Sequence, residues 1–502
     1  MSQATNRCTA LVRSLPERLR ADRLPFCSAF LAGFLAHGFA FANKLLNSDE
    51  ISSLFGKGMT VAAGRWGLEL SSLLFPDVSM PWIYGLLSLL LLSAACCLIL
   101  RVFRIRSTLL RCVLPALVTV FPAQTATFSY MFTAPSYALA FLLAVAAVWC
   151  TERESLAGWL GGLLLLLLSV SIYQAYIAIA GSFFVLRMIQ KLLQDRGSAG
   201  EILLFGLKRL ALLALTLGLY YLSIHIALFF YGGRFENYGV EQERSLFFRA
   251  AVAYSAFLHT FTRGYFHYVR GGFSLLLHAL CLGLTGFVCL RWLLRCRDLG
   301  KALLFLLCLL LFPLSVYCIY LIAETGIIHT MVLFSFVSVY VFAALAAERL
   351  EGPRAPAARQ ILALCLALVA LGNCYFANAF YLKLHIRYEN AYALYTGLAA
   401  QIRQTPGFDG ETKIALLGKA EDGIYGLEEM EELDLIGQAE DLANVYTRED
   451  LLRRYVGFQV PFADEEEKAA LGRDPRVLEM PVYPAYGSVQ LIDGFIVVRL
   501  GD

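Results

Sequence analysis

The chain has 502 residues, of which 59% are hydrophobic and 16% are charged. Soluble domains carry about a quarter charged residues, so this balance excludes a single soluble domain and predicts a polytopic membrane protein. The net charge of +3 hides an asymmetry: residues 382–502 hold 12 of the 42 basic and 22 of the 39 acidic residues, which makes this tail −10 and the rest of the chain +13.

Long apolar segments divide most of the chain. A helix needs about 20 apolar residues to cross the hydrocarbon of a bilayer. About eleven segments approach this length, and they predict an all-α membrane protein with about 11 transmembrane helices. They are residues 24–46, 81–103, 107–123, 132–150, 156–172, 174–193, 203–230, 271–294, 301–322, 328–347 and 360–381.

Basic residues alternate along these segments as the positive-inside rule requires. With the N-terminus in the cytoplasm, Arg and Lys collect in every inner segment, whereas the short outer segments at 123–131 and 323–330 contain neither. The pattern predicts a multi-pass membrane protein whose N-terminus lies in the cytoplasm. An odd number of spans then places the C-terminal tail outside the cytoplasm.

The first outer segment, 47–80, opens with two adjacent carboxylates, Asp49 and Glu50. Ionisable groups beside a membrane are costly and tend to be functional when they face a cavity. A carboxylate here could accept the proton of an attacking hydroxyl, or the pair could hold a divalent cation such as Mg or Mn. The structural alternative is that Asp49 caps a following helix.

The same segment continues to the motif Gly64-Arg65-Trp66. Gly64 permits close approach of another group, Arg65 can bind a phosphate bidentately, and Trp66 can stack on a sugar. The alternative is an arginine that extends toward water beside a tryptophan of the interfacial belt.

Further polar residues lie at predicted outer turns. Tyr173 and Gln174 stand where two apolar segments meet, Tyr130 lies in the turn 122–137, and Glu324 and His329 lie in the turn "AETGIIHT". The hydrogen-bonding groups of these side chains would face the same compartment as Asp49, which makes them candidates for binding a ligand there. Polar contacts between helices are the alternative for Tyr173 and Gln174.

The second long outer segment covers residues 231–270 and mixes arginine, histidine and aromatic residues. This composition is typical of an amphipathic element at the membrane surface. Its candidate site residues are Arg234, Arg263, Arg270, Tyr265 and Tyr268.

The tail from residue 385 has the character of a soluble domain. Residues 412–418 predict a buried strand, residues 448–458 a short helix, and residues 486–500 a hairpin that turns at Asp493-Gly494. We therefore predict two domains: a membrane domain at 1–384, with outer loops 47–80 and 231–270, and an extracytoplasmic α+β domain at 385–502.

The distribution of polar residues bears on the class of function. Transporters place polar residues near the bilayer midplane, whereas the polar residues here gather at outer helix ends. His225 and His278 are strongly ionisable residues within the spans, and each of them lies apart from other such residues. The pattern favours chemistry at the outer surface, and a lipid-linked sugar flippase or transporter, a polysaccharide polymerase, and a structural scaffold are the alternatives.

Several motifs, taken in order, resemble those of the bacterial glucosyl transferase II family, which includes serotype-converting enzymes. They are "NSDE", "GRW", "FSYMFTAPSYALAFLL", "SIYQAYIA" and, in the tail, "HIRYENAYALYTGLAAQI" and "IALLG". The resemblance covers most of the chain. Many relatives carry two aspartates where this chain has Asp49 and Glu50, which leaves open which of the two acts.

The resemblance implies an integral-membrane glycosyltransferase of the GT-C class. Its expected partners are the lipid bilayer, a polyprenyl-phosphate sugar donor, with glucose as the sugar, and a surface glycan acceptor; a lipid-sugar flippase could associate with it, and we expect no nucleic acid. It implies that an acidic residue of the first outer loop is catalytic, a role that falls on Asp49 or Glu50. Arginines would bind the departing phosphate, and a single displacement would invert the anomeric centre.

Overall fold

The computed structural model describes residues 2–58, 60–232, 234–235, 244–263, 271–322, 328–420, 433, 435, 442 and 444–501, with the backbone alone for residues 2–20, 262, 263 and 271. The chain forms two compact units. The first comprises Met1–Asn43 and Met59–Asn378, and the second comprises Lys44–Gly58 and Ala379–Asp502. Each unit is described separately below.

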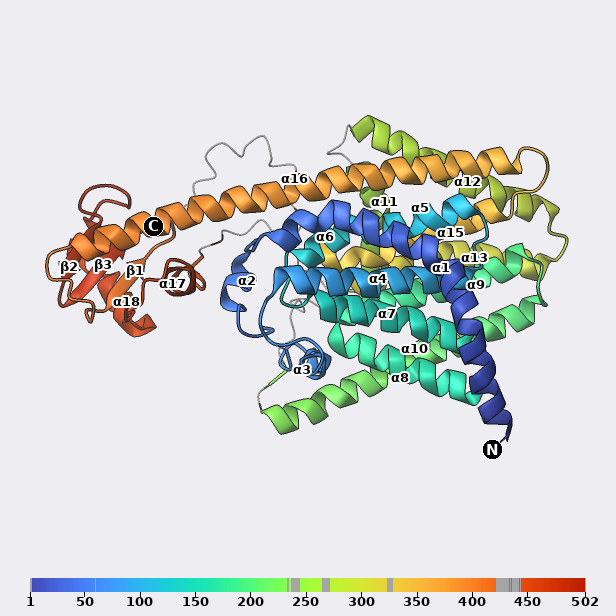
Figure 1. The fold of residues 1–502 in the computed structure, drawn as a ribbon, viewed down its shortest axis with the longest axis horizontal. Coiled ribbons are helices and arrows are strands. Elements are labelled where there is room, and N and C mark those ends of the chain that lie inside the picture. Colours follow the sequence, from blue (N-terminus) through green and yellow to red (C-terminus); the bar gives the residue numbers. More distant parts are fainter. Residues whose placement is uncertain are drawn as a thin grey trace. The chain divides into compact units, whose positions relative to one another are not determined.

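The first unit is built from helices (Figure 1). In chain order they are α1 (Ser2–Ala42), α3 (Trp66–Ser71), α4 (Pro81–Phe103), α5 (Thr108–Thr119), α6 (Pro122–Phe128), α7 (Ala134–Thr151), α8 (Leu156–Ile172), η1 (Gln174–Tyr176), α9 (Ile177–Leu193), α10 (Ala199–Tyr231), α11 (Leu246–Arg263), α12 (Gly271–Arg295), α13 (Leu299–Val316), α14 (Ile319–Ile322), η3 (Thr330–Phe336), α15 (Val337–Glu348) and the first part of α16 (Ala355–Gln404). Helices α1, α4, α7 and α8 pack in succession.

The predicted fold class is confirmed. Among the described residues, nine helices are long and apolar enough to cross a membrane, α5 and α6 form a further pair bent by 43°, and α8 is a shorter apolar helix of 17 residues. The bend falls at Phe121-Pro122, where proline disfavours a helical conformation of the residue before it. The chain is therefore a polytopic, mostly helical membrane protein with a small C-terminal sheet.

One predicted span ends earlier than its hydropathy indicates. Residues 301–322 were expected as a single helix, but α13 stops at Val316 and the short α14 follows. Pro313 lies inside α13 and has no backbone N–H to donate to the preceding turn. The apolar composition continues past this proline, which is why hydropathy alone does not reveal the break.

The second unit has a three-stranded sheet with the order β1-β3-β2. Strand β1 (Ile414–Leu417) runs parallel to β3 (Phe495–Arg499), and β2 (Val489–Ile492) pairs antiparallel with β3. The helical elements are α2 (Ser48–Ser52), the rest of α16, α17 (Arg448–Asp450), η5 (Leu451–Tyr455), α18 (Glu465–Leu471) and α19 (Pro475–Leu478).

The elements predicted for the tail are confirmed. The buried strand is β1, the helix at 448–458 is α17 with η5, and the hairpin joins β2 to β3. Asp493 and Gly494 both have positive φ, 48° and 85°, as a tight two-residue hairpin turn requires.

Residues 44–58 belong to the core of this second unit, although the sequence assigned them to the membrane domain. Leu46 and Ile51 are fully buried in one apolar cluster with Tyr395, Leu398 and Ile402 of α16. Arg454 donates from Nη1 to the carbonyl of Ser52 at 2.7 Å. A contact over some 350–400 residues of sequence is invisible to local patterns.

Replacing Ile51 by alanine should therefore destabilise the second unit. Ile51→Ala removes buried methyl groups, and such changes cost about 2–5 kcal/mol. Limited proteolysis of the detergent-solubilised protein should cleave the 44–58 segment faster. The matched control is Phe55→Ala, because Phe55 lies in the same segment but is 70% exposed. Equal cleavage rates for the two variants would contradict the placement of Ile51 in this core.

Candidate functional site

The carboxylate pair lies in the first turn of α2. Asn47, with extended backbone at φ −122°, caps this helix, and its Oδ1 accepts from the backbone N–H of Glu50 at 2.8 Å. The alternative that Asp49 is the cap is therefore wrong. Asn47 occupies the cap position two residues earlier, which leaves the Asp49 carboxylate outside that role.

Asp49 and Glu50 have different surroundings. Glu50 is fully buried and forms an ion pair with Lys44, whose side chain is a quarter exposed, whereas Asp49 is exposed. The ion pair compensates the cost of burying the Glu50 charge. Asp49 is thus the carboxylate of the two that a molecule from solution can reach.

Tyr455 is a neighbour of this pair that sequence reasoning missed. Burial raises the pKa of its hydroxyl, and the negative charge of Glu50 raises this pKa further. Its Oη is buried and has no hydrogen-bond partner in the described part of the chain. Tyr455 is about 400 residues from Glu50 in sequence, so no local motif could indicate their proximity.

Arg65 lies in the first unit, at the start of α3, on a loop that several hydrogen bonds fix. Gly64 has φ +74°, which favours glycine, and its carbonyl accepts from Tyr220 Oη at 3.0 Å. Gln174 Nε2 donates to the carbonyl of Ala63 at 2.8 Å. A Cβ at Gly64 would stand 2.6 Å from Tyr220 Oη, so the expected close approach at this glycine is confirmed.

Two tyrosines hold the Arg65 guanidinium. Its central carbon lies 5.4 Å from the centre of the Tyr173 ring, and its Nη1 donates to Tyr137 Oη at 3.4 Å. The rings of Tyr137 and Tyr173 stack with centres 4.2 Å apart. The half-buried guanidinium is a planar donor beside aromatic faces, an arrangement suited to an anionic oxygen.

Trp66 and Glu69 follow Arg65 on α3 and form hydrogen bonds of their own. Trp66 Nε1 donates to Ser223 Oγ of α10 at 2.9 Å. Glu69 accepts a hydrogen bond from Thr60 and was not predicted. Its spacing of four residues from Arg65 was the signal that could have identified it. Tyr137 and Tyr220 were also missed, because their approach to the loop is a tertiary contact.

The remaining predicted residues have varied positions. Tyr130 is buried beside Phe132, with ring centres 6.2 Å apart, whereas Arg234 and His329 are exposed. Tyr265, Tyr268, Arg270, Glu324 and the side chain of Arg263 lie outside the described residues. Within the described residues, no group of three or more His, Cys, Asp or Glu side chains is arranged to hold a metal ion.

The structure thus divides the predicted site. It brings Arg65, Trp66, Tyr173 and Gln174 together in the first unit, whereas the carboxylate pair belongs to the second. Each group has its own network of supporting contacts.

A family model described as glucosyl transferase GtrII matches residues 38–346, which is more than half of the chain. The chain belongs to the glucosyl transferase GtrII family. The match includes the carboxylate pair and the whole Arg65 network, so both parts of the candidate site lie in the region that defines the GtrII family. Neither the curated proteins nor the solved structures include a match to the chain.

Membership confirms the resemblance noted in the sequence and assigns this multi-pass protein to a family of glucosyltransferases. The matched region ends in α15, before the tail that forms most of the second unit.

Removing the Tyr220 hydroxyl should loosen the Arg65 loop. Tyr220→Phe leaves the buried carbonyl of Gly64 without this donor, and an orphaned buried group costs about 1–3 kcal/mol. The midpoint of thermal unfolding in detergent should fall. Tyr221→Phe is the control, because this neighbouring tyrosine is 61% exposed. A Tyr220→Phe midpoint equal to that of the control would contradict the role given to this hydrogen bond.

Proposed function

We propose that this GtrII protein transfers glucose from a polyprenyl-phosphate donor to a surface glycan, on the extracytoplasmic side of the bacterial inner membrane. The observation that carries the proposal is the Arg65 guanidinium, held half-buried against Tyr173 within the family-matched region of a multi-pass membrane protein. In a polyprenyl-phosphate donor the phosphate lies next to a lipid chain that is embedded in the membrane. A phosphate is a group that an arginine such as Arg65 binds.

The orientation rests on charge. Basic residues gather in alternate connections between the spans, and this alternation supports a cytoplasmic N-terminus. The connections that carry Asp49 and Arg65 then face the outer compartment. The tail domain follows on the same side, where a glycan acceptor would be found.

In the proposed reaction an acceptor hydroxyl attacks the anomeric carbon of the donor sugar. The new carbon–oxygen bond forms as the bond to the phosphate oxygen breaks, and the anomeric centre inverts. Asp49 takes the hydroxyl proton as general base. The phosphate oxygen takes the electron pair of the broken bond, so the departing polyprenyl phosphate gains a negative charge, which Arg65 offsets. Arg234, Arg263 and Arg270 are further candidates for this contact.

The two carboxylates have separate proposed roles. Asp49 is exposed in the first turn of α2, so it can meet an acceptor hydroxyl. Glu50 forms an ion pair with Lys44, and this contact stabilises the turn of α2 that carries Asp49. We therefore assign Glu50 the role of positioning Asp49. Tyr455 lies beside Glu50 with its hydroxyl buried, so its proposed role is to support the carboxylate pair from behind, without contact to the acceptor. Trp66, Tyr130, Tyr173, Gln174, Tyr265, Tyr268, Glu324 and His329 remain candidates for sugar and acceptor contacts.

Asp49→Asn should abolish most of the transfer. Loss of a general base typically lowers the turnover by about 10²–10⁴-fold, and the donor KM should change little because Arg65 is intact. The measurement is glucose transfer from defined polyprenyl-phosphate glucose by the purified full chain. The control is Asp77→Asn, which removes another exposed carboxylate of the same outer segment.

Full turnover by Asp49→Asn would overturn the assignment of the base. Glu50→Gln should lower activity for a different reason, because it removes the ion pair between Lys44 and the buried Glu50 carboxylate. The double variant Lys44→Met with Glu50→Gln should recover stability relative to Glu50→Gln. Asp49→Asn should show no such rescue when Lys44→Met is added.

A further inference from the structure

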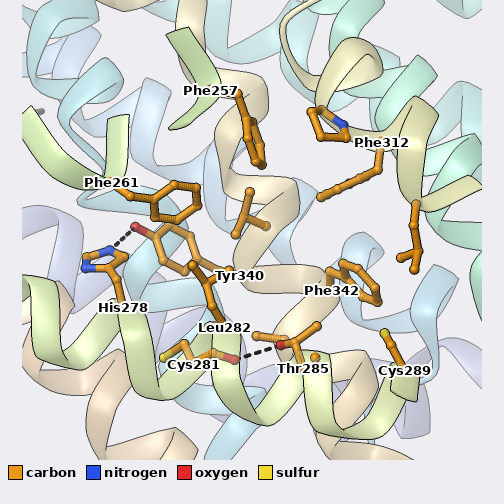
Figure 2. Close-up of a pocket in the computed structure, with 15 residues that line it drawn as sticks. Phe257, Phe261, His278, Cys281, Leu282, Thr285, Cys289, Phe312, Tyr340 and Phe342 are labelled. Carbon is orange, nitrogen blue, oxygen red and sulfur yellow. Dashed lines mark hydrogen bonds between the residues drawn. The ribbon is translucent and has the colours of Figure 1, made fainter. Parts of the chain in front are cut away.

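A cavity of about 240 Å³ lies inside the first unit, between α11, α12, α13 and α15 (Figure 2). Five aromatic side chains account for much of its lining: Phe257, Phe261, Phe312, Tyr340 and Phe342. Three of the four helices belong to candidate membrane spans, so the cavity lies in the part of the first unit that is expected to cross the bilayer. None of its residues was a candidate in the sequence.

The polar side chains of the lining are engaged with one another or with the backbone. His278 Nδ1 pairs with the carbonyl of Ser274 at 2.8 Å, and its Nε2 pairs with Tyr340 Oη at 3.0 Å, as Figure 2 shows for the latter. Thr285 Oγ1 donates to the carbonyl of Cys281 at 2.8 Å. The cavity therefore presents aromatic and aliphatic surface, which favours an apolar ligand over a polar head group.

The cavity has an opening on α12. Leu282 and Gly286 both line it and are exposed, and a Cβ added at Gly286 would meet no atom within 4 Å. The same helix carries further exposed leucines, which face lipid in a membrane span: Leu275, Leu276, Leu280 and Leu290. The opening is thus continuous with the lipid-facing surface, and a hydrocarbon chain can enter from the bilayer.

Aromatic rings connect this cavity with Arg65. Phe336 of η3 packs against the cavity residues Phe257 and Phe261, with ring centres 5.8 and 5.1 Å apart. From Phe336 the contacts continue through Phe121, Phe334, Tyr176 and Tyr173, each ring centre between 5.4 and 6.3 Å from the next. Tyr173 is the ring over which the Arg65 guanidinium lies.

We propose that this cavity binds part of the isoprenoid chain of the lipid-linked donor. The inference rests on the proposed function, because it takes the donor phosphate to lie at Arg65. The rings between the cavity and Arg65 are buried core. The chain of a lipid held at Arg65 therefore runs along the lipid-facing surface and enters the cavity through the opening at Leu282 and Gly286. The volume is below the roughly 300–1,000 Å³ of ordinary ligand pockets, so the cavity holds a segment of the chain.

Two glycines of α12 give a matched test. At both Gly286 and Gly283 an added Cβ would meet no atom within 4 Å, but only Gly286 lines the cavity. Gly286→Phe should fill the cavity, whereas Gly283→Phe should place its ring elsewhere on the same helix. Binding of sugar-free, long-chain polyprenyl phosphate to the full chain in nanodiscs is measured by native mass spectrometry.

Gly286→Phe should weaken this binding about tenfold relative to Gly283→Phe, the loss expected when about two methylene groups no longer find a buried site. Transfer from a long-chain donor should fall in parallel, and transfer from a short-chain donor should be equal in the two variants. Equal binding of the long chain by both variants would overturn the inference.

Two further outcomes separate the sources of failure. If a straight-chain alkyl phosphate of matched length loses affinity in Gly286→Phe as much as the isoprenoid does, the cavity accepts any lipid chain and the inference fails. If the unmodified chain binds polyprenyl phosphate, with the expected difference between the variants, but transfers no glucose from any donor, the cavity assignment is supported and the proposed transferase function fails.

Discussion

The placement of the Arg65 guanidinium against Tyr173 is the interaction on which the account depends. An arginine near the hydrocarbon is costly unless its charge has compensating contacts. The Tyr173 ring and the Tyr137 hydroxyl supply such contacts, and the loop before Arg65 is tied to α10 and η1 through Tyr220 and Gln174. The guanidinium is therefore oriented before any ligand binds, which reduces the cost of ordering it upon binding.

The carboxylate pair depends on a different part of the chain. The segment 44–58 packs through Leu46 and Ile51 into the core that α16, η5 and the sheet form, so the surroundings of Asp49 are built by residues from both ends of the sequence. The Lys44–Glu50 ion pair adds a local restraint. The tail domain therefore fixes the position of the segment that carries the proposed base, Asp49.

Much of the fold could be predicted from local patterns, since apolar segments of about 20 residues and Asp-Gly turns carry their own signal. The close approach at Gly64 followed from its residue type. Contacts between distant segments could not be predicted. These contacts include the capping of α2 by Asn47 and the packing of Ile51 in the core of the tail domain. They also include the contacts of Tyr137 and Tyr220 with the Arg65 loop and of Tyr455 with the carboxylate pair. The cavity near Phe336 was hidden because core and cavity aromatics have the same pattern in sequence.

The most direct test of the account is the donor affinity of Arg65→Lys. Lysine keeps the charge but lacks the planar donors that bind phosphate oxygens and lie against an aromatic ring. The account predicts that the KM for polyprenyl-phosphate glucose, and the Kd for sugar-free polyprenyl phosphate, rise at least about tenfold while the acceptor KM stays the same. Unchanged donor and polyprenyl-phosphate affinities in a folded Arg65→Lys protein would contradict it.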